Sequence, residues 1–398
     1  MTKRTLGDLD PAHLAGQRVV VRADLNVPMT DGAITDDTRL RASLPTIQYL
    51  HDKGARVIVL SHLGRPKGAP DPGYSLKPVA RALEALLGFP ITFLTDPASA
   101  DAVAQVRHMP RGGVAVGENT RFYPGEETND PGLAERFAAL GDIYVNDAFG
   151  SAHRAHASTE AIAHLLKPAV AGFLMECELK FLGDAVEHAA RPFVAILGGA
   201  KISGKIDLVE ALLPKVDRIL IGGAMACTFF KAMGYETGNS LVEADRVEMA
   251  KALLAKAGDK LMLPTGAVIA QRLETGAGTR EVARDQIPTG WSVFDIDSAT
   301  VQAFTNEIAA AKTVIWNGPM GVFETPPFDY GTVGVARALA AATRAGAITI
   351  VGGGDSAAAV TAAGLDHDVT HVSTGGGATL EFLEGKSLPG VAALDDVR

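Results

Sequence analysis

The sequence contains only two cysteines, Cys177 and Cys227, and they stand far apart in the chain. Two isolated cysteines form neither a disulfide framework nor the spacing of a zinc site, so we expect a reducing, cytoplasmic setting. No run approaches the roughly 18 apolar residues of a membrane-spanning helix. The first residues also lack the apolar core of a signal peptide. The sequence therefore predicts neither a membrane protein nor a secreted one.

Positive charge is limited as well. Lys and Arg total 37 against 46 Asp and Glu, a net charge of −9, so no overall basic field draws the protein to nucleic acid or to an anionic membrane. Aromatic residues make up only 6% of the chain, whereas glycine is abundant with 43 residues, which suits tightly packed layers of helix and sheet. A length of 398 residues predicts two domains or more. No distinct oligomerisation segment is evident, which favours a monomer.

Short runs rich in valine and isoleucine alternate with helical patterns along the chain. Such continuous runs are typical of strands buried on both faces. Their alternation with helices indicates α/β architecture with parallel sheets. The predicted strands are residues 18–23, 57–61, 113–116, 143–146, 193–197, 218–221, 260–263, 313–316 and 347–351, and the predicted helices include 77–87, 131–139, 205–213 and 245–257. Residues 173–188 are predicted as a helix without a strand partner, which indicates an interdomain connector.

Residues 348–356, ITIVGGGDS, join an apolar run to three glycines, an acid, a hydroxyl and the start of a helix. Glycine lets the backbone approach a phosphate closely, and the N–H groups of the first helical turn point at it. The same stretch also suits an ordinary tight turn. Residues 199–205 match seven places of a phosphate-binding P-loop, but Ile206 stands where that motif needs Ser or Thr. Neither triple glycine forms a nicotinamide-binding fingerprint.

Polar residues follow most predicted strands, and they differ between the two halves of the chain. Ligands of parallel sheets bind beyond the carboxyl ends of the strands. Arginine suits capture of carboxylate or phosphate in the first half; glycine turns with Lys201 and Lys205 suit a polyphosphate in the second. Each polar residue taken alone could simply cap a helix or turn a loop. The cations of the first half are Arg22, Arg39, Arg41, His62, Arg65, Lys67, Arg121, His153, Arg154 and His156.

Eight stretches in order resemble the phosphoglycerate kinase family. They are RADLNVP (22–28), SHLGRP (61–66), ENTRFYPGEE (118–127), NDAFGSAHRAHAS (146–158), LGGAKISGKI (197–206), WNGPMGVFE (316–324), GGGDS (352–356) and STGGGATLEFLEG (373–385). The resemblance implies two Rossmann-like domains, each a mainly parallel sheet flanked by helices: an N-terminal 3-phosphoglycerate-binding domain (1–172) and a C-terminal nucleotide-binding domain (189–380). A hinge helix (173–188) would join them, and a tail (381–398) would return to the first.

The family's activity is reversible phosphoryl transfer between 1,3-bisphosphoglycerate and ADP, giving 3-phosphoglycerate and ATP, with Mg²⁺, in glycolysis, gluconeogenesis or carbon fixation. By position, the resemblance implies that 3-phosphoglycerate is held by Asp24, Leu25, Asn26, Arg39, His62, Leu63, Gly64, Arg65, Arg121 and Arg154, beside a basic patch with His153 and His156. It implies that the nucleotide is held by Lys201, Lys205, Gly222, Gly223, Asn317, Glu324, Gly353, Gly354, Asp355 and Ser356, with Asp355 meeting the magnesium.

The acceptor in the ATP-consuming direction is a carboxylate that is already ionised, so we expect no general base. Arg39 and Lys201 are the candidates to neutralise the transferring group, with backbone N–H groups near Gly354 and Gly376. We expect the two ligands to sit on different domains and to meet when these close about the hinge.

The chain departs from the family pattern at four positions. The family usually has Asp where this chain has Gly204, an acid in place of Gly266, a glycine in place of Asp297, and a lysine in place of Cys177 in the hinge helix. None touches the transferring phosphate in this interpretation, and Asp297 concerns a backbone contact on the purine side. Two other functions stay open on the residues alone: a kinase for another small carboxylate or phosphorylated acid, and a catalytically inactive nucleotide-binding homologue.

Overall fold

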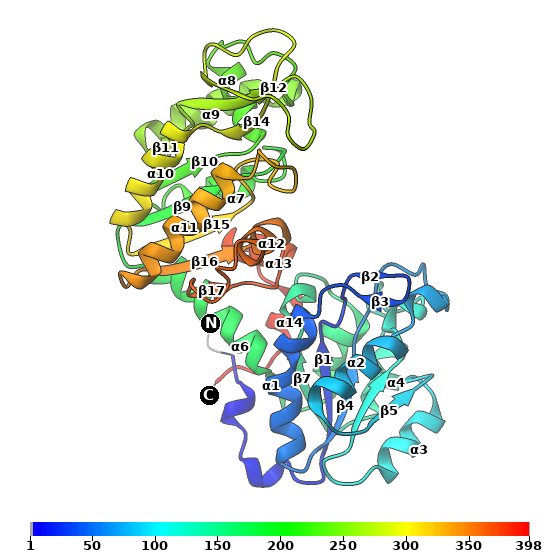
Figure 1. The fold of residues 1–398 in the computed structure, drawn as a ribbon. Helices are drawn as coiled ribbons and strands as arrows, with labels where there is room; N and C mark the ends of the chain where they lie inside the picture. The colour runs from blue at the N-terminus through cyan, green and yellow to red at the C-terminus, as the bar shows by residue number, and fades with distance from the viewer. Residues whose placement is uncertain (1–2, 398) are drawn as a thin grey trace. The chain divides into compact units, whose positions relative to one another are not determined.

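The computed structural model describes residues 3–397, which divide into two compact units (Figure 1). Unit 1 runs to Lys180 and also takes in the segment from Ser387 onward, and unit 2 is Phe181–Lys386. Each unit is built around a parallel sheet with helices packed on it. The α/β architecture predicted from strand–helix alternation is confirmed.

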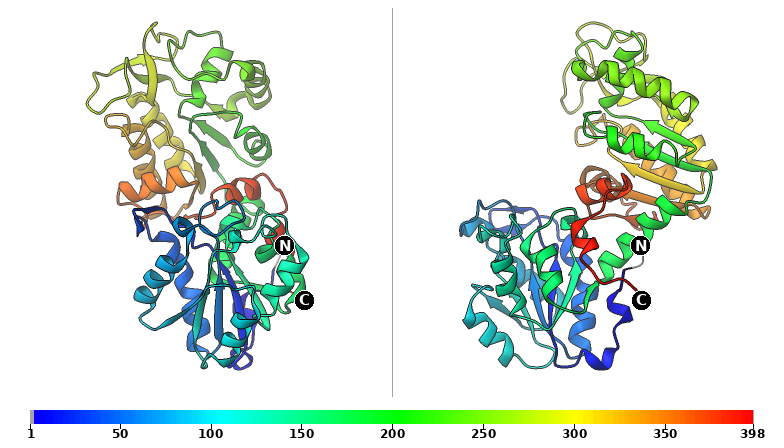
Figure 2. Two further views of the ribbon diagram at one scale, coloured as in Figure 1. Left: turned by 90° about the vertical axis from the view of Figure 1, so that its right-hand side faces the viewer. Right: turned by 180° about the vertical axis from the view of Figure 1, so that it is seen from behind.

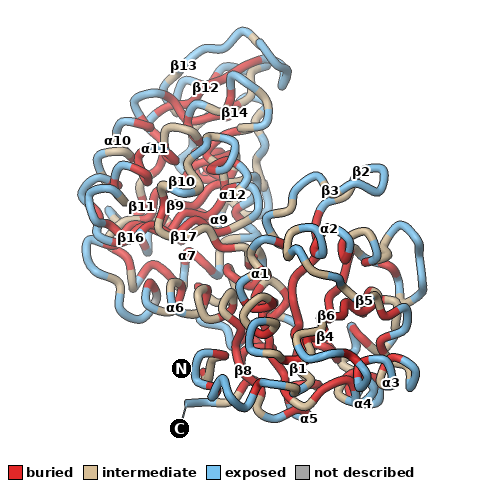
Figure 3. Tube along the Cα trace, turned by 60° about the horizontal axis from the view of Figure 1, so that its bottom comes forward, coloured by how far each residue is buried: buried red, intermediate tan, exposed pale blue. Residues whose placement is uncertain are grey.

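Unit 1 contains a six-stranded sheet in the order β5-β6-β4-β1-β7-β8, and every neighbouring pair is parallel. The valine-rich strands at its centre are buried (Figure 3), as expected for a sheet covered on both faces. The strands are β1 (Arg18–Ala23), β4 (Arg56–Leu60), β5 (Ile91–Leu94), β6 (Val114–Gly117), β7 (Ile143–Asp147) and β8 (Ala169–Ala171), beside a small hairpin of β2 (Met29–Thr30) and β3 (Ala33–Ile34).

Two helices of unit 1, α3 and α4, begin after a residue whose side chain caps the first turn. Ser99 accepts a hydrogen bond from the Ala102 amide at 3.1 Å, and Asp130 accepts one from the Leu133 amide at 2.7 Å, which satisfies N–H groups that the first turn leaves unpaired. Gly88, with φ +78°, ends α2. The helices are α1 (Thr38–Asp52), α2 (Lys77–Leu87), α3 (Ala100–His108), α4 (Pro131–Ala138), α5 (Ile162–Leu165) and α14 (Pro389–Ala392).

Unit 2 contains a second parallel sheet, in the order β11-β10-β9-β15-β16-β17. Numbered along the chain, this is the order 3-2-1-4-5-6 of a dinucleotide-binding fold, in which the strand order reverses between β9 and β15. Folds of this kind bind their ligands at the carboxyl ends of the strands where the order reverses. The strands are β9 (Phe193–Leu197), β10 (Arg218–Ile221), β11 (Leu261–Met262), β15 (Thr313–Asn317), β16 (Ile348–Gly352) and β17 (His371–Val372).

Seven helices of the described chain lie entirely within unit 2, and a small antiparallel sheet, β13-β12-β14, accompanies them. The sequence did not predict this sheet, because one of its strands is mostly exposed and polar and has no apolar run. Its strands are β12 (Gly266–Ala270), β13 (Arg280–Ala283) and β14 (Ser292–Ile296). The helices are α7 (Ile206–Leu212), α8 (Met225–Ala232), α9 (Val247–Ala257), α10 (Ser298–Ala310), α11 (Tyr330–Arg344), α12 (Gly354–Ala362) and α13 (Gly377–Leu383).

The chain passes from unit 1 to unit 2 within α6 (Phe173–Glu187) and returns after Lys386. Buried Asp147, at the end of β7, accepts hydrogen bonds from the Leu174 and Met175 amides at 2.9 and 3.2 Å and so caps the start of α6. The returning segment is held within unit 1, where the Asn146 side chain donates to the Gly390 carbonyl at 3.0 Å (Figure 2). Adjacent residues of one strand thus anchor both connections.

Candidate active site

At the carboxyl edge of the first sheet, Arg39 of α1 joins the loop after β1. Its Nη1 donates to the two carboxylate oxygens of Asp24 at 3.0 and 3.1 Å and to the Asn26 carbonyl at 3.1 Å. The Asn26 side-chain oxygen accepts from the Gly64 amide at 2.8 Å. The loops after β1 and β4 are therefore fixed to each other, and Arg39 stands at their junction.

The loop after β4 takes its shape from neighbours in unit 1. Gly64 has φ +60°, and a Cβ there would lie 2.3 Å from the Tyr74 ring, so only glycine fits. The Asn119 side chain donates to the Leu63 and Tyr74 carbonyls at 2.7 and 2.9 Å. Arg121 donates to the Gly64 carbonyl at 2.7 Å. This frame places His62 and Arg121 beside each other with little freedom to move.

The structure brings seven cationic or potentially cationic side chains of the first half together. Burial and the positive charges of Arg22, Arg121, Arg39 and His156 hold the pKa of His62 well below its usual value. Burial, followed by the charges of Arg22, Arg121 and Arg154 and by His153, lowers the pKa of His156 to about 3, and burial lowers the pKa of Arg121. We call this group the cation cluster; its members are Arg22, Arg39, His62, Arg121, His153, Arg154 and His156.

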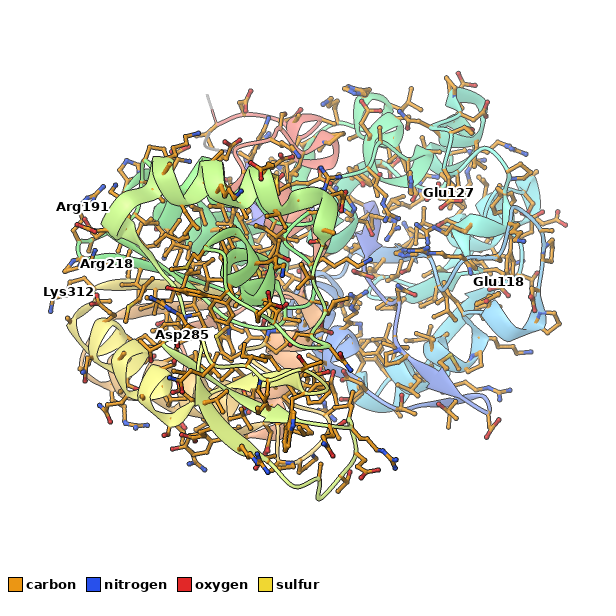
Figure 4. The ribbon with its side chains drawn as sticks, turned by 90° about the horizontal axis from the view of Figure 1, so that it is seen from above. Glu118, Glu127, Arg191, Arg218, Asp285 and Lys312 are labelled. Carbon is orange, nitrogen blue, oxygen red and sulfur yellow. The ribbon has the colours of Figure 1, made fainter. Side chains whose placement is uncertain are left out.

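Carboxylates offset only part of this charge. Asp24 pairs with Arg39, and Glu127, which Figure 4 labels, lies 3.1 Å from Nε of Arg121. Burial, and after it the neighbouring arginines, lowers the pKa values of His62 and His156, which indicates that an anion bound beside these side chains would be stabilised by the arginine charges.

Three further residues predicted in this pocket lie around the cation cluster. Leu25 and Leu63 are buried, and the Leu25 amide donates to Ser61 Oγ at 2.9 Å. Arg65 is exposed immediately after Gly64, and among residues 3–397 the structure records no bond between it and the cation cluster. Its predicted role therefore depends on a ligand rather than on an existing contact.

In unit 2, Lys205 lies where the strand order reverses. Its amine donates to the Asn317 carbonyl at 2.7 Å and to the Asn317 side-chain oxygen. The Asn317 side chain in turn donates to the Gly352 carbonyl at 2.9 Å. The ends of β15 and β16 and the start of α7 are thus tied together. Burial lowers the pKa of Lys205 to about 8, against the attraction of the Asp355 carboxylate, which acts to raise it.

The glycine turns of unit 2 pack backbone against backbone. A Cβ on Gly223 would lie 2.4 Å from the Gly199 amide, so the loops after β9 and β10 touch without side chains between them; Gly222 beside it is buried. Gly353, with φ +92°, precedes α12, whose first residue is exposed Gly354. Free N–H groups of a helix start are a favourable place for phosphate.

Other predicted nucleotide-binding residues lie on the same edge or near it. Ser356 is buried and accepts from the Gly318 amide at 2.6 Å, which joins the start of α12 to the loop after β15. Gly376 immediately precedes α13. Lys201 and Glu324 are exposed, the first in the loop after β9 and the second after β15, and the structure records no bond from either to Lys205 within the described residues.

Asp355 is the candidate for Mg²⁺. It is exposed in the first turn of α12 and close enough to Lys205 to affect its pKa. No group of three His, Cys, Asp or Glu side chains among residues 3–397 could hold an ion by itself. Mg²⁺ that arrives with a nucleotide needs only one or two carboxylates besides the phosphates, so a lone exposed Asp355 fits that mode of binding.

Comparisons with known proteins show the family to which the chain belongs. Residues 9–386 match the family model described as phosphoglycerate kinase. The chain belongs to the phosphoglycerate kinase family. Phosphoglycerate kinases of Chlorobaculum tepidum and Synechococcus elongatus are 55% and 53% identical over the full length of both chains. The structure of phosphoglycerate kinase from Coxiella burnetii superposes with a TM-score of 0.88, 42% identity and 98% of each chain covered.

The family that the eight motifs indicated is thus confirmed. Phosphoglycerate kinases are phosphotransferases with a carboxyl group as acceptor, so the expected reaction class is confirmed as well. Membership of the family also favours 3-phosphoglycerate over the other acceptors left open above. None of the helices among residues 3–397 combines the length and apolar character needed to cross a membrane. The individual site residues stay predictions.

Two departures from the phosphoglycerate kinase pattern, Gly266 and Asp297, turn out to be neighbours. The Asp297 side chain caps α10, accepting from the Thr300 amide at 2.9 Å and from the Thr300 hydroxyl. A Cβ on Gly266 would lie 2.3 Å from the Asp297 carboxylate. The backbone of Gly266 is outside the left-handed region, so the missing side chain reflects occupied space rather than a turn. With an acid at 266 and a glycine at 297, the carboxylate at this place would come from residue 266 instead of residue 297.

We expect Gly266→Asp alone to lower the denaturation midpoint, because a second carboxylate would be forced onto Asp297 at a cost of about 1–3 kcal/mol. The double variant Gly266→Asp/Asp297→Gly should recover part of that loss, because a Cβ at 266 would still lie 2.6 Å from the Val282 carbonyl, and we expect a coupling energy of about 1–3 kcal/mol in a double-mutant cycle followed by urea denaturation. Additive effects of the two substitutions would contradict a shared carboxylate position.

Some residues that shape the site had no distinct signal in the sequence. Asn119 and Tyr74 are hydrogen-bonded to each other beside the loop after β4. Ser158 accepts a hydrogen bond from Arg22 and donates one to Glu126. Asn119 and Glu126 belong to a recognised motif, yet nothing in the motif separates a supporting side chain from one that meets a ligand.

Proposed function

We propose that unit 1 binds 3-phosphoglycerate or 1,3-bisphosphoglycerate at the cation cluster and that unit 2 binds ATP or ADP around Lys205 and Asn317. The observation that carries this proposal is the contrast between the two carboxyl edges. One gathers four arginines and three histidines, with Asp24, Glu126 and Glu127 beside three of the arginines, and the other presents glycine backbone and a partly buried lysine where a nucleotide-binding sheet reverses its strand order.

Phosphoryl transfer to a carboxylate requires positioning and charge neutralisation rather than proton removal. Arg39 can position the ligand, because Asp24 and the Asn26 carbonyl hold its side chain through Nη1 and leave Nη2 and Nε for the ligand. Lys201 of unit 2 can neutralise charge on the transferring group. Its loop is held in place because Ser203 donates hydrogen bonds to the Glu243 carboxylate. Amide groups at the starts of α12 and α13, near Gly354 and Gly376, would hold the transferring phosphate.

Asp355 would hold the Mg²⁺ that accompanies the nucleotide. When bound, Mg²⁺ neutralises phosphate charge and orients the phosphate chain. The chain itself presents the exposed Asp355 carboxylate near the Lys205 ammonium. The carboxylate would bind the metal ion, and the ammonium would bind the phosphate chain.

The proposal is tested by turnover. We expect the purified full-length protein to consume ATP when 3-phosphoglycerate and Mg²⁺ are supplied, with formation of the acyl phosphate followed by a coupled reductive assay. Removal of Mg²⁺ with a chelator should abolish turnover, and re-addition should restore it. ATP consumption with other small carboxylates but not with 3-phosphoglycerate would overturn the assignment of the acceptor.

We also propose that the protein acts as a cytoplasmic monomer and that transfer requires closure about α6, because the two ligands are assigned to different units. Closure would bring the ligands together and exclude water, which otherwise hydrolyses the acyl phosphate. We expect small-angle scattering to give a smaller radius of gyration with both ligands than with neither, at a mass of one chain. An unchanged radius would argue against closure.

A further inference from the structure

Arg22 is a fully buried arginine at the end of β1 that carries a hydrogen bond to His62. Its three hydrogen bonds use three different nitrogens. Nε donates to Ser158 Oγ at 2.8 Å, Nη1 donates to the Ala23 carbonyl at 2.5 Å, and Nη2 lies 3.1 Å from Nδ1 of His62. With three nitrogens engaged from three directions, the guanidinium plane has one orientation.

We infer that Arg22 is a positioning residue that holds His62 as the neutral imidazole with its proton on Nε2, so that the 3-phosphoglycerate pocket meets an N–H donor rather than an imidazolium. The inference rests on the proposed function only for the identity of the ligand. The form of the ring is a property of the free protein.

The chemistry of the two groups dictates this assignment. A guanidinium has donors and no acceptor, so a hydrogen bond between Arg22 Nη2 and His62 Nδ1 requires a lone pair on Nδ1. A neutral imidazole with a lone pair on Nδ1 carries its proton on Nε2. The protonated ring would instead set an N–H against an N–H, with two positive charges in contact and no water to separate them.

The side chains that most affect the pKa of His62 from the surrounding elements favour the same form. These groups are Arg22 on β1, Arg39 on α1, Arg121 on the short 3₁₀ helix Thr120–Phe122 and His156 before α5, and all four lower the pKa of His62. The nearby carboxylates are engaged elsewhere, since Asp24 pairs with Arg39 and Glu127 with Arg121. No carboxylate is recorded against the ring among residues 3–397.

Ser158 and Glu126 explain how a buried arginine charge is tolerated behind the pocket. The Ser158 hydroxyl accepts from Arg22 and donates its proton to the Glu126 carboxylate, which also accepts from the Ser158 amide at 3.0 Å. Both residues are fully buried. Glu126 thus supplies the counter-charge one hydroxyl away, which leaves Nη2 of Arg22 free to serve His62.

A division of labour in the pocket follows. The arginines attract the substrate's phosphate and carboxylate by charge, whereas His62 offers a directed, uncharged N–H whose presence does not vary across physiological pH. Such a donor can distinguish a hydroxyl or carboxylate oxygen by position without adding to the mutual repulsion of the cation cluster.

Nitrogen NMR of the full-length protein with ¹⁵N-labelled histidine tests the inference, because two-bond ¹H–¹⁵N correlations distinguish the two neutral forms and the imidazolium. The His62 signals are assigned by their loss in His62→Gln. We expect a protonated Nε2 and a bare Nδ1, unchanged between pH 6 and pH 8. A proton on Nδ1, or protonation of the ring within that range, would overturn the inference.

His51 provides a matched control in the same spectrum. Its Nδ1 lies 2.6 Å from the Gly112 carbonyl, an acceptor, so it should show the opposite pattern with the proton on Nδ1. The wild-type spectrum decides the question without any variant having to fold.

Two variants then test whether Arg22 is the cause. Ser158→Ala removes the acceptor of Arg22 Nε, and Arg22→Met removes the donors. In both variants we expect His62 to lose the correlations of a single neutral form. Its signals should instead average between the two neutral forms or titrate between pH 6 and pH 8, while the His51 signals stay as in the wild-type protein. An unaltered His62 pattern in a folded Arg22→Met protein would exclude Arg22 as the cause. Because turnover is a separate measurement, failure here leaves the proposed function standing.

Discussion

Arg39→Ala is expected to lower kcat at least ~100-fold, about 2.7 kcal/mol in transition-state stabilisation, while nucleotide affinity stays within about twofold. The asymmetry follows from where Arg39 is held. It belongs to unit 1, its Nη1 is fixed by Asp24 and the Asn26 carbonyl, and its remaining nitrogens are those available to the transferring group. Steady-state turnover with 3-phosphoglycerate, together with calorimetric titration of ATP, measures both quantities.

Arg41 supplies the control for that substitution, because it lies on the same helix and carries the same charge. Its side chain is exposed and pairs with Asp37, away from the cation cluster. Arg41→Ala removes one positive charge from unit 1 without touching the loops that Arg39 joins, so kcat should be preserved. Equal losses in the two variants would mean that net charge rather than position matters, and Arg39 would lose its assignment in the chemistry.

Lys205→Met is expected to weaken ATP binding by about 10- to 100-fold, the ~1.5–3 kcal/mol of a hydrogen bond to a charged group, with little change in 3-phosphoglycerate affinity. The amine is tied to both oxygens of Asn317, so the charge is presented at a defined point at the carboxyl end of β15, where the strand order reverses. Calorimetric titration of each ligand separates the two affinities. Lys251→Met, at an exposed position on α9 where the lysine pairs only with Glu248, is the matched control.

The lowered pKa of Lys205 adds a dependence on pH with a definite sign. The amine is charged below its pKa of about 8 and loses its proton as pH rises past that value. Wild-type affinity for ATP should therefore fall between pH 7 and pH 9, and Lys205→Met should lack that part of the decline. A wild-type affinity that is flat over this range would show that the amine stays protonated or does not contact the phosphates.

The central strands of both sheets could be located from the sequence because they are buried on both faces. β1 and β9 have the predicted bounds, since the three valines at 19–21 and residues 193–197 are continuous apolar runs that any neighbouring layer would bury. The edge strand β5 and the exposed strand β13 lack that signature, and β8 is only three residues long. Their positions depend on hydrogen bonding to a sheet that already exists.

The candidate site divides in a similar way. Residues that end strands, such as Asp24, His62 and Asn317, were predictable as a group because the carboxyl ends of parallel strands lie on one edge. Which of them touch was not predictable. Asn119 frames the loop after β4 through two carbonyls, and Ser158 reaches Arg22 across 136 positions of sequence, contacts that no local pattern encodes.

By itself, then, the sequence determined the α/β class, the family and the distribution of chemistry between the halves of the chain, because burial patterns and strand-end residues are local properties. Only the tertiary structure decided that Gly266 and Asp297 compete for one carboxylate position and that Arg22 faces Nδ1 of His62. Both facts are distances of a few ångströms between residues far apart in the chain, and such distances exist only once the layers have packed.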